Sequence, residues 1–248
     1  MKDIVQKLKK YEAELAAVER EFQEMPEGWL LKKGKYFYHV INGRRGGITK
    51  NTPLIKKLCR KKYLQARKAQ LTHNLFRLGN KDKPLNLATP EELIASFSKT
   101  YQSLPISYFY HSDAEKYLQR QCNTNNYKTE NLTYETNGGT LVRTKSELMI
   151  ANLLEELEIP YRYEIPIKMG GKVRYLDFTI VHPFTGEIII WEHFGALHLE
   201  GYEKGMNKKM KEYLTHGLRP FETLIYTFEF DTATPGRIKE LIEQVILK

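Results

Sequence analysis

Two carboxylates, Asp177 and Glu192, stand inside the most apolar segments of the sequence, and their spacing predicts that they meet. Residues 173–181 and 187–194 have the composition of β-strands. The short link at 183–186 predicts a tight hairpin between them. In an unbulged register centred on that link, Asp177 lies directly opposite Glu192 on one face of the sheet, with the two Cβ atoms about 5 Å apart.

Two acids in this position are unfavourable unless something relieves their repulsion. At an effective dielectric constant near 20, the two charges repel by roughly 3 kcal/mol. A shared proton would offset this repulsion, and so would a Mg²⁺ or Mn²⁺ ion, since both cations prefer oxygen ligands. The alternative is that the hairpin is bulged, or that a nearby cation such as Lys172 or Arg174 neutralises each acid.

A third acid, Glu147, is predicted to point towards the core. In a helix over residues 145–158, it shares one stripe with the apolar residues three, seven and ten positions later. A carboxylate on an apolar stripe needs a partner, and we expect Glu147 to share the cation of Asp177 and Glu192. The alternative is that it only complements the dipole at the start of the helix.

A lysine, Lys209, is the fourth candidate. In a helix over residues 200–216 it lies on one stripe with Tyr202, Met210 and Tyr213. A lysine among apolar residues either extends its ammonium group to water or meets an anion. Beside two carboxylates and a phosphate group, Lys209 would orient the attacking water or offset charge in the transition state. Both readings of this lysine stay open.

The elements that must position these residues follow one another in the order α-β-β-β-α-β-α. Two tight links predict antiparallel pairing of the first three strands, and a helical crossover predicts that the last strand is parallel to its neighbour. The predicted elements are a helix at 145–158, strands at 161–168, 173–181 and 187–194, a helix at 200–216, a strand at 222–229 and a helix at 235–247.

The sequence order of Glu147 on a helix, Asp177 on a strand and Glu192 on the next strand resembles the PD-(D/E)XK nucleases, the restriction-endonuclease-like superfamily. The element order is similar to that family's α-β-β-β-α-β core, and the resemblance covers about residues 143–231. It implies that Asp177 and Glu192 bind Mg²⁺ or Mn²⁺, and that Glu147 binds the same ion directly or through water. It also implies hydrolysis of phosphodiester bonds.

Two positions depart from the family's pattern. Leu176 stands where the family often has proline, and Phe194 stands where the motif's lysine belongs. In this family the lysine can come from another element, and Lys209 looks like such a replacement, with Tyr213 one turn later to support water or phosphate. His193 lies on the other strand face if the strand is regular, and joins the catalytic residues only if the strand ends there.

The first half of the chain is predicted to be mostly helical. A helix over residues 2–25 has apolar residues at steps of three and four, which is typical of a coiled-coil seam. A β-hairpin follows at 29–50, and a second long helix at 52–78 is expected to pair with the first. Shorter helices are predicted to begin near Thr89 and Ser112.

Together these elements predict an α+β protein in three parts. A basic helical and hairpin domain would cover residues 1–121, and a linker or long loop rich in Asn, Thr and Gly would cover 122–142. A nuclease-like domain with a mixed sheet would cover 143–248.

The positive charge of the chain is concentrated in its first half. Residues 1–140 hold 25 Lys and Arg against 14 Asp and Glu, whereas residues 141–248 hold 14 against 16, which together give the net charge of +9. From Lys32 to Lys83, 16 positive residues face one acid, Asp82. Such a segment is typical of a surface that contacts the backbone of nucleic acid, and the alternative is a solvated helix face.

These features predict a metal-dependent nuclease that acts on DNA or RNA, with DNA preferred. One alternative is an inactive nuclease fold that binds nucleic acid, which Phe194 favours. Another is an interaction protein, or a homo-oligomer, formed through the seam of the first helix. The sequence shows no secretory signal or apolar membrane span, and its two cysteines form no metal-type pair, so we expect a cytoplasmic protein without a membrane partner.

Overall fold

The computed structural model describes residues 2–78, 84–119 and 125–247. The chain divides into two compact units, Met1–Tyr110 and His111–Lys248, and each is described by itself. This division falls before the helix predicted at Ser112, because the segment at 111–119 packs in the second unit. There, the backbone N–H of His111 donates to the carbonyl oxygen of Pro183. Asp82, Cys122 and the start of the linker predicted at 122–142 lie outside the described residues.

The first unit is built on two long helices, α1 (Lys2–Gln23) and α2 (Thr52–Leu78). They pack antiparallel, as predicted, and the seam of α1 is covered by α2. Two ion pairs fix their register: Arg60 with Glu21 at 2.7 Å and Arg67 with Glu14 at 2.6 Å. The apolar contact between them joins Leu64 and Leu71 to the seam residues Tyr11, Leu15, Val18, Phe22 and Met25.

A three-stranded antiparallel sheet lies between the two long helices in sequence. Its strands are β1 (Trp29–Lys33), β2 (Tyr36–Ile41) and β3 (Arg44–Gly47), in that spatial order. The predicted hairpin therefore has one strand more than expected. Asn42 and Gly43 make the second turn with φ values of 48° and 75°, which is the conformation that an Asn-Gly pair adopts in a two-residue hairpin turn.

Shorter helices follow α2 in the sequence. The helix at Thr89 is confirmed: Thr89 and Glu92 form a reciprocal capping box at its start. The helix at Ser112 is also confirmed, and one four-residue helix was not predicted. These helices are α3 (Pro90–Ala95), α4 (Lys99–Gln102) and α5 (Ser112–Gln119), with a 3₁₀ turn at Ile106–Phe109.

The second unit contains a mixed four-stranded sheet in the order β6-β7-β8-β9. The first three strands are antiparallel and β9 is parallel to β8, as predicted. The element order α-β-β-β-α-β-α is confirmed, so the chain is a mixed α+β protein. The elements are α6 (Lys145–Glu156), β6 (Tyr161–Met169), β7 (Lys172–Val181), β8 (Ile188–Phe194), α7 (Tyr202–Thr215), β9 (Leu224–Phe228) and α8 (Pro235–Val245).

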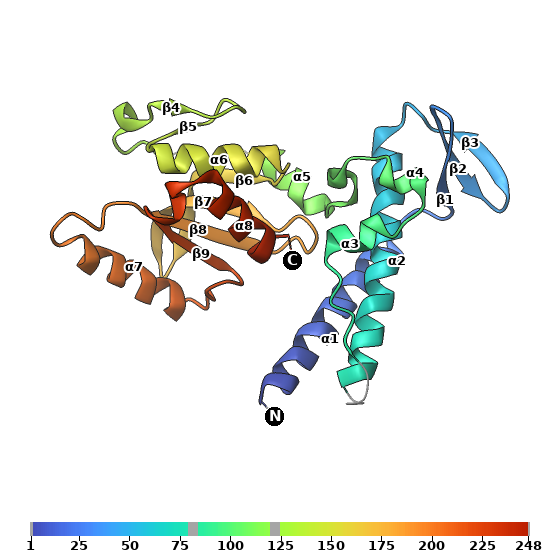
Figure 1. The fold of residues 1–248 in the computed structure, drawn as a ribbon, viewed down its shortest axis with the longest axis horizontal. Helices are drawn as coiled ribbons and strands as arrows, with labels where there is room; N and C mark the ends of the chain where they lie inside the picture. Colours follow the sequence, from blue (N-terminus) through green and yellow to red (C-terminus); the bar gives the residue numbers. More distant parts are fainter. Residues whose placement is uncertain (1, 79–83, 120–124, 248) are drawn as a thin grey trace. The chain divides into compact units, whose positions relative to one another are not determined.

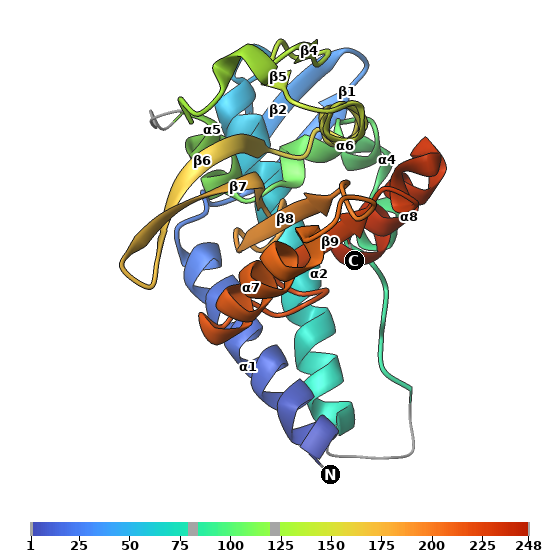
Figure 2. The same ribbon diagram turned by 90° about the vertical axis from the view of Figure 1, so that its left-hand side faces the viewer.

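Helices cover both faces of this sheet (Figures 1 and 2). On one face, Tyr213 and Met210 of α7 pack against Leu176, Ile190 and Leu224. On the other face lie α6 and α8, which contact each other. Among the helices of the described residues, none combines the length and apolarity that a membrane span requires.

The segment predicted as a linker carries structure of its own in its described part, from 125 onwards. Two short strands, β4 (Tyr134–Glu135) and β5 (Leu141–Val142), form an antiparallel pair. Glu155 of α6 holds this pair, because its carboxylate accepts hydrogen bonds from the Thr136 hydroxyl at 2.7 Å and from the Gly138 N–H at 2.7 Å.

Candidate active site

Asp177 and Glu192 come together where the backbone pairing of β7 and β8 ends. The ladder runs from Val181↔Ile188 to Phe178↔Trp191, which is the predicted unbulged register. One step further, the ladder stops. Asp177 does not form a ladder pair with Glu192; instead its Oδ2 atom accepts a hydrogen bond of 2.7 Å from the backbone N–H of His193.

The electrostatics of Asp177 show that the acids are close neighbours. Its pKa lies well above the ordinary value of 3.8, first because burial disfavours the charged form and then because Glu192 and Glu147 repel it. The His193 N–H and the Lys209 ammonium act in the opposite direction without reversing the shift. The protein therefore holds Asp177 in surroundings that would be improved by an additional positive charge.

Glu192 is almost completely buried, with 1% of its surface exposed. Its Oε2 accepts a hydrogen bond of 3.0 Å from Lys209 Nζ, whereas Oε1 makes no hydrogen bond of good geometry among the described residues, and the neutral Tyr213 hydroxyl lies beside the carboxylate. A buried carboxylate oxygen without a partner is costly. This oxygen and the raised pKa of Asp177 point to the same gap in charge compensation.

Lys209 is the single lysine that reaches the carboxylates within the described residues. Burial lowers the pKa of its ammonium group, but the charges of Glu192 and Asp177 outweigh burial, so the pKa lies above its ordinary value. Lys209 therefore stays protonated and acts as a charged donor, not as a base. Arg174, a sequence candidate for neutralising Asp177, is instead bound to Glu212 at 2.8 Å.

Glu147 is buried, as predicted, but its hydrogen bonds explain its position without a cation. Its Oε2 accepts from the backbone N–H groups of Arg143 and Thr144 and from the Tyr163 hydroxyl, at 3.1, 2.8 and 3.0 Å. With Thr144 it forms a capping box at the start of α6. The alternative of a helix-start role is therefore realised, although Glu147 still lies close enough to Asp177 to raise its pKa.

Two variants separate the capping role of Glu147 from a ligand role. Glu147→Gln keeps a side chain that completes a capping box, so we expect stability within about 0.5 kcal/mol of wild type and the same stabilisation by added Mg²⁺ or Mn²⁺ as in wild type. Glu147→Ala removes the cap and is expected to lower the free energy of unfolding by about 1–2 kcal/mol. Urea titration measures both, with Lys145→Ala on the same turn as the control. Loss of the stabilisation by Mg²⁺ or Mn²⁺ in Glu147→Gln would instead identify Glu147 as a metal ligand.

The two residues that follow Glu192 in β8 have structural roles. Phe194 is 2% exposed and packs on Phe228 with a centroid distance of 6.1 Å, so the motif's lysine position is filled by a core residue. The ring of His193 lies on the opposite face, within 3.1 Å of Thr227 Oγ1 and 3.3 Å of Glu229 Oε2. His193 therefore contributes its backbone N–H, and its predicted catalytic side chain does not join the carboxylates.

Tyrosines surround the carboxylate pair. Burial, the negative charge of Glu192 and a side-chain hydrogen bond with Glu192 raise the pKa of Tyr213. Tyr202, at the start of α7, lies close enough that Lys209 and Asp177 influence its pKa, which burial raises. Tyr202 was not among the predicted site residues, although its place on the Lys209 stripe was the signal that would have identified it.

The donor set fits an oxygen-preferring divalent cation at a two-carboxylate site. Asp177 and Glu192 are neighbouring carboxylates that share one positive group, Lys209, and Oε1 of Glu192 makes no hydrogen bond of good geometry within the described residues. No group of three or more His, Cys, Asp or Glu that could hold a metal ion occurs within the described residues, and Glu147 is bound in its helix cap.

Comparisons with protein-family models, with curated proteins and with solved structures were made for the whole chain. None of the three gives a match. The function of the chain is therefore inferred from the chemistry of the site itself.

Proposed function

We propose that the chain is a nuclease that hydrolyses phosphodiester bonds with Mg²⁺ or Mn²⁺. The observation that carries the proposal is a pair of neighbouring carboxylates with a single lysine between them: Glu192 is buried and its Oε1 makes no hydrogen bond of good geometry within the described residues, and the pKa of Asp177 is raised by burial and then by Glu192. Two neighbouring buried acids at the end of a strand pair lower the stability of the fold, so their presence is better explained by a role at a functional site. The resemblance of the motif order to the PD-(D/E)XK nucleases supports the same activity.

Asp177 and Glu192 would hold the cation. Such an ion would lower the pKa of a bound water and stabilise the departing oxygen. Lys209, which stays protonated, would donate to the phosphate or hold the attacking water, and Tyr213 would support it from the next turn of α7. Asp177 is already oriented by the His193 N–H, so its free oxygen has a fixed direction.

The first unit would bind the backbone of the nucleic acid, although fewer of its cations are available than the sequence indicates. Arg60 and Arg67 are bound to acids of α1, which compensate the basic face of α2. Exposed cations remain on α2, such as Lys57, and five more lie in and beside the three-stranded sheet: Lys33, Lys35, Arg44, Arg45 and Lys50. No Asp or Glu occurs from residue 28 to residue 81, so this surface favours a polyanion.

The test is cleavage of labelled single-stranded and duplex DNA and RNA in Mg²⁺ or Mn²⁺. Wild type should cut at least one of these substrates, Glu192→Gln should not, and Glu187→Gln, which alters an exposed acid in the same hairpin, should resemble wild type. Equal cutting by all three proteins would reject the site.

The second candidate function is a nucleic-acid-binding protein with an inactive nuclease fold. The observation that favours it is Phe194, a buried aromatic residue at the motif's lysine position. It predicts salt-sensitive binding by wild type with no cleavage under any metal, and equal binding by Glu192→Gln.

A further inference from the structure

A continuous run of aromatic rings extends along β9, an edge strand of the four-stranded sheet. Phe221, Tyr226, Phe228 and Phe230 contact one another in that order, with ring centroids 5.9, 6.0 and 5.8 Å apart. The two end members, Phe221 and Phe230, are each 62% exposed. We call these four residues the β9 aromatic strip.

The strip lies on the face of the sheet that carries the candidate site. In the parallel register of β8 and β9, Glu192 is paired with Tyr226 and Phe194 is paired with Phe228, and paired residues project to the same side. Neighbouring strands are about 4.8 Å apart, so the backbone of the strip at Tyr226 lies one strand spacing from the backbone of Glu192. Tyr226 also packs against the cluster that contains Tyr213.

Folding alone does not account for the exposed ends of the strip. Single exposed phenylalanines are common on protein surfaces, but a contiguous apolar patch beside a polar site is typical of a binding surface. Phe228 and Phe230 are stacked with an interplanar angle of 16°, so their rings form a nearly flat pair. The other two contacts of the strip have interplanar angles of 45° and 71°, so the rings available to a planar ligand are the exposed end rings, Phe221 and Phe230.

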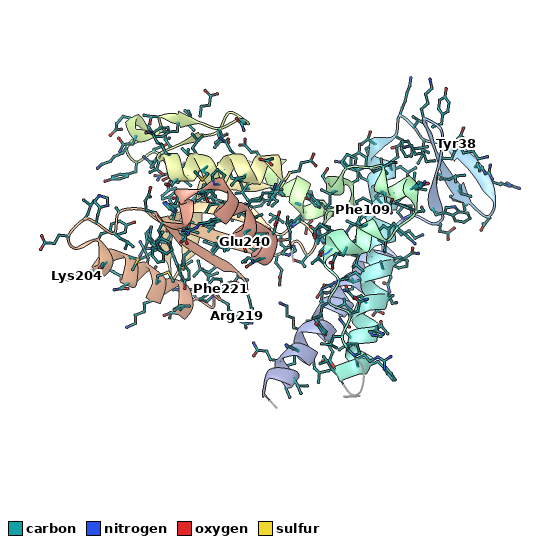
Figure 3. All side chains as sticks on the ribbon, in the orientation of Figure 1. Tyr38, Phe109, Lys204, Arg219, Phe221 and Glu240 are labelled. Atoms are coloured by element: carbon teal, nitrogen blue, oxygen red, sulfur yellow. The ribbon has the colours of Figure 1, made fainter. Side chains whose placement is uncertain are left out.

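Positive groups lie at both ends of the strip. Arg219 is two residues before Phe221; its side chain is 68% exposed, and its guanidinium group forms an exposed ion pair of 3.5 Å with Glu222, which contributes little. Figure 3 shows these two labelled residues together in the segment that leads into β9. At the other end, the guanidinium group of Arg237 donates to the carbonyl oxygen of Phe230 at 2.9 Å. Rings flanked by guanidinium groups match a ligand that alternates planar bases with phosphates.

We propose that the β9 aromatic strip binds unpaired bases of single-stranded nucleic acid. A duplex keeps the faces of its bases stacked inside, so the rings of the strip have access only to bases that are unpaired. This inference rests on the proposed function, because a nuclease site at Asp177 and Glu192 would bring a nucleic-acid strand to this face. The strip would then hold the nucleotides next to the phosphodiester that is cut. It thereby names single strands, or frayed ends, as the preferred substrate.

The test is binding of a fluorescein-labelled oligothymidylate to the full chain, measured by anisotropy in EDTA so that nothing is cut. About 0.2 M salt weakens phosphate contacts and leaves stacking visible. Phe221→Ala and Phe230→Ala should each weaken binding by about fivefold or more. Phe230→Trp should bind like wild type, and so should Tyr127→Ala, which removes an aromatic residue of the same unit that is 66% exposed. Affinity for a blunt duplex should not change.

The outcomes separate this inference from the nuclease proposal. Strip-dependent binding by a protein that never cuts would support the strip and reject the nuclease. Metal-dependent cutting that Phe221→Ala and Phe230→Ala leave unchanged, together with unchanged binding, would reject the strip alone. Loss of self-association in these variants, seen by sedimentation with unchanged affinity for the oligonucleotide, would overturn the inference in favour of a contact between two copies of the chain.

Discussion

An Asp177→Asn variant is expected to lose at least about a thousandfold in cleavage while becoming more stable than wild type. Asparagine has nearly the same shape and still offers an oxygen to the His193 N–H, so the fold is preserved. It removes the charge that Glu192 and Glu147 repel, which should raise the free energy of unfolding by about 1–3 kcal/mol without metal. A loss of cleavage of this size corresponds to about 4 kcal/mol in the activation barrier.

The pH dependence of stability provides an independent check of the same feature. Because the pKa of Asp177 is raised in the folded state, folding favours its protonated form. Its contribution to stability is therefore present at low pH and is lost as pH rises above the ordinary value of 3.8 towards the folded-state pKa. In the metal-free protein, the difference in unfolding free energy between Asp177→Asn and wild type should grow over that range.

Urea titrations at several pH values, in EDTA, measure this difference, and a cleavage assay measures the loss of activity. Mg²⁺ or Mn²⁺ should stabilise wild type more than the variant, because the variant has lost a ligand. A variant that is less stable than wild type at neutral pH, or that still cuts, would contradict the assignment of Asp177.

A Lys209→Met variant is expected to reduce cleavage by about a hundredfold to a thousandfold, the usual effect of removing one charged or hydrogen-bonding group at a reacting centre. Methionine keeps the length and apolar body of the side chain but loses the bond to Glu192 Oε2. The buried carboxylate then keeps only the neutral Tyr213 hydroxyl beside it, so stability without metal should also fall, by about 1–2 kcal/mol.

A double variant distinguishes the structural role of Lys209 from its chemical role. Adding Glu192→Gln removes the negative charge that Lys209→Met leaves unpaired. The double variant should therefore regain much of the stability that Lys209→Met loses, but no cleavage activity. The matched control is Lys208→Met, an exposed neighbour in α7, which should behave like wild type in both assays. If Lys208→Met and Lys209→Met lost cleavage equally, the effect would be one of general charge and not of the site.

Most of the fold of the second unit follows from simple periodicities in the sequence. The helix stripe that contains Ile150 and Leu154, and the apolar strands on both sides of the turn at 183–186, predict the correct elements in the correct order. The register of β7 and β8 was also predictable, because a short turn leaves few ways to pair two apolar strands. The position of Lys209 followed from its place on an apolar stripe.

The remaining features depend on contacts that leave no local pattern. The basic face of α2 seemed free in the sequence because its partner acids lie far away: Glu21 is 39 residues from Arg60, and Glu14 is 53 residues from Arg67. The two-residue strands β4 and β5 are too short to show a periodicity. The capping role of Glu147 was considered, but its bond to Tyr163, 16 residues later, was not foreseeable.

The hydrogen bond between Asp177 and the N–H of His193 has a consequence for ligand affinity. One oxygen of the carboxylate is fixed to the backbone, so the side chain has already lost its rotational freedom before any ion arrives. Immobilising a free side chain on binding usually costs about 0.5–1.5 kcal/mol, and this preorganised carboxylate avoids that cost. In an Asp177→Glu variant the carboxylate would have the same charge on a longer side chain and would lose the hydrogen bond from the His193 N–H. A substitution that keeps the charge at this position therefore does not keep the function of the residue.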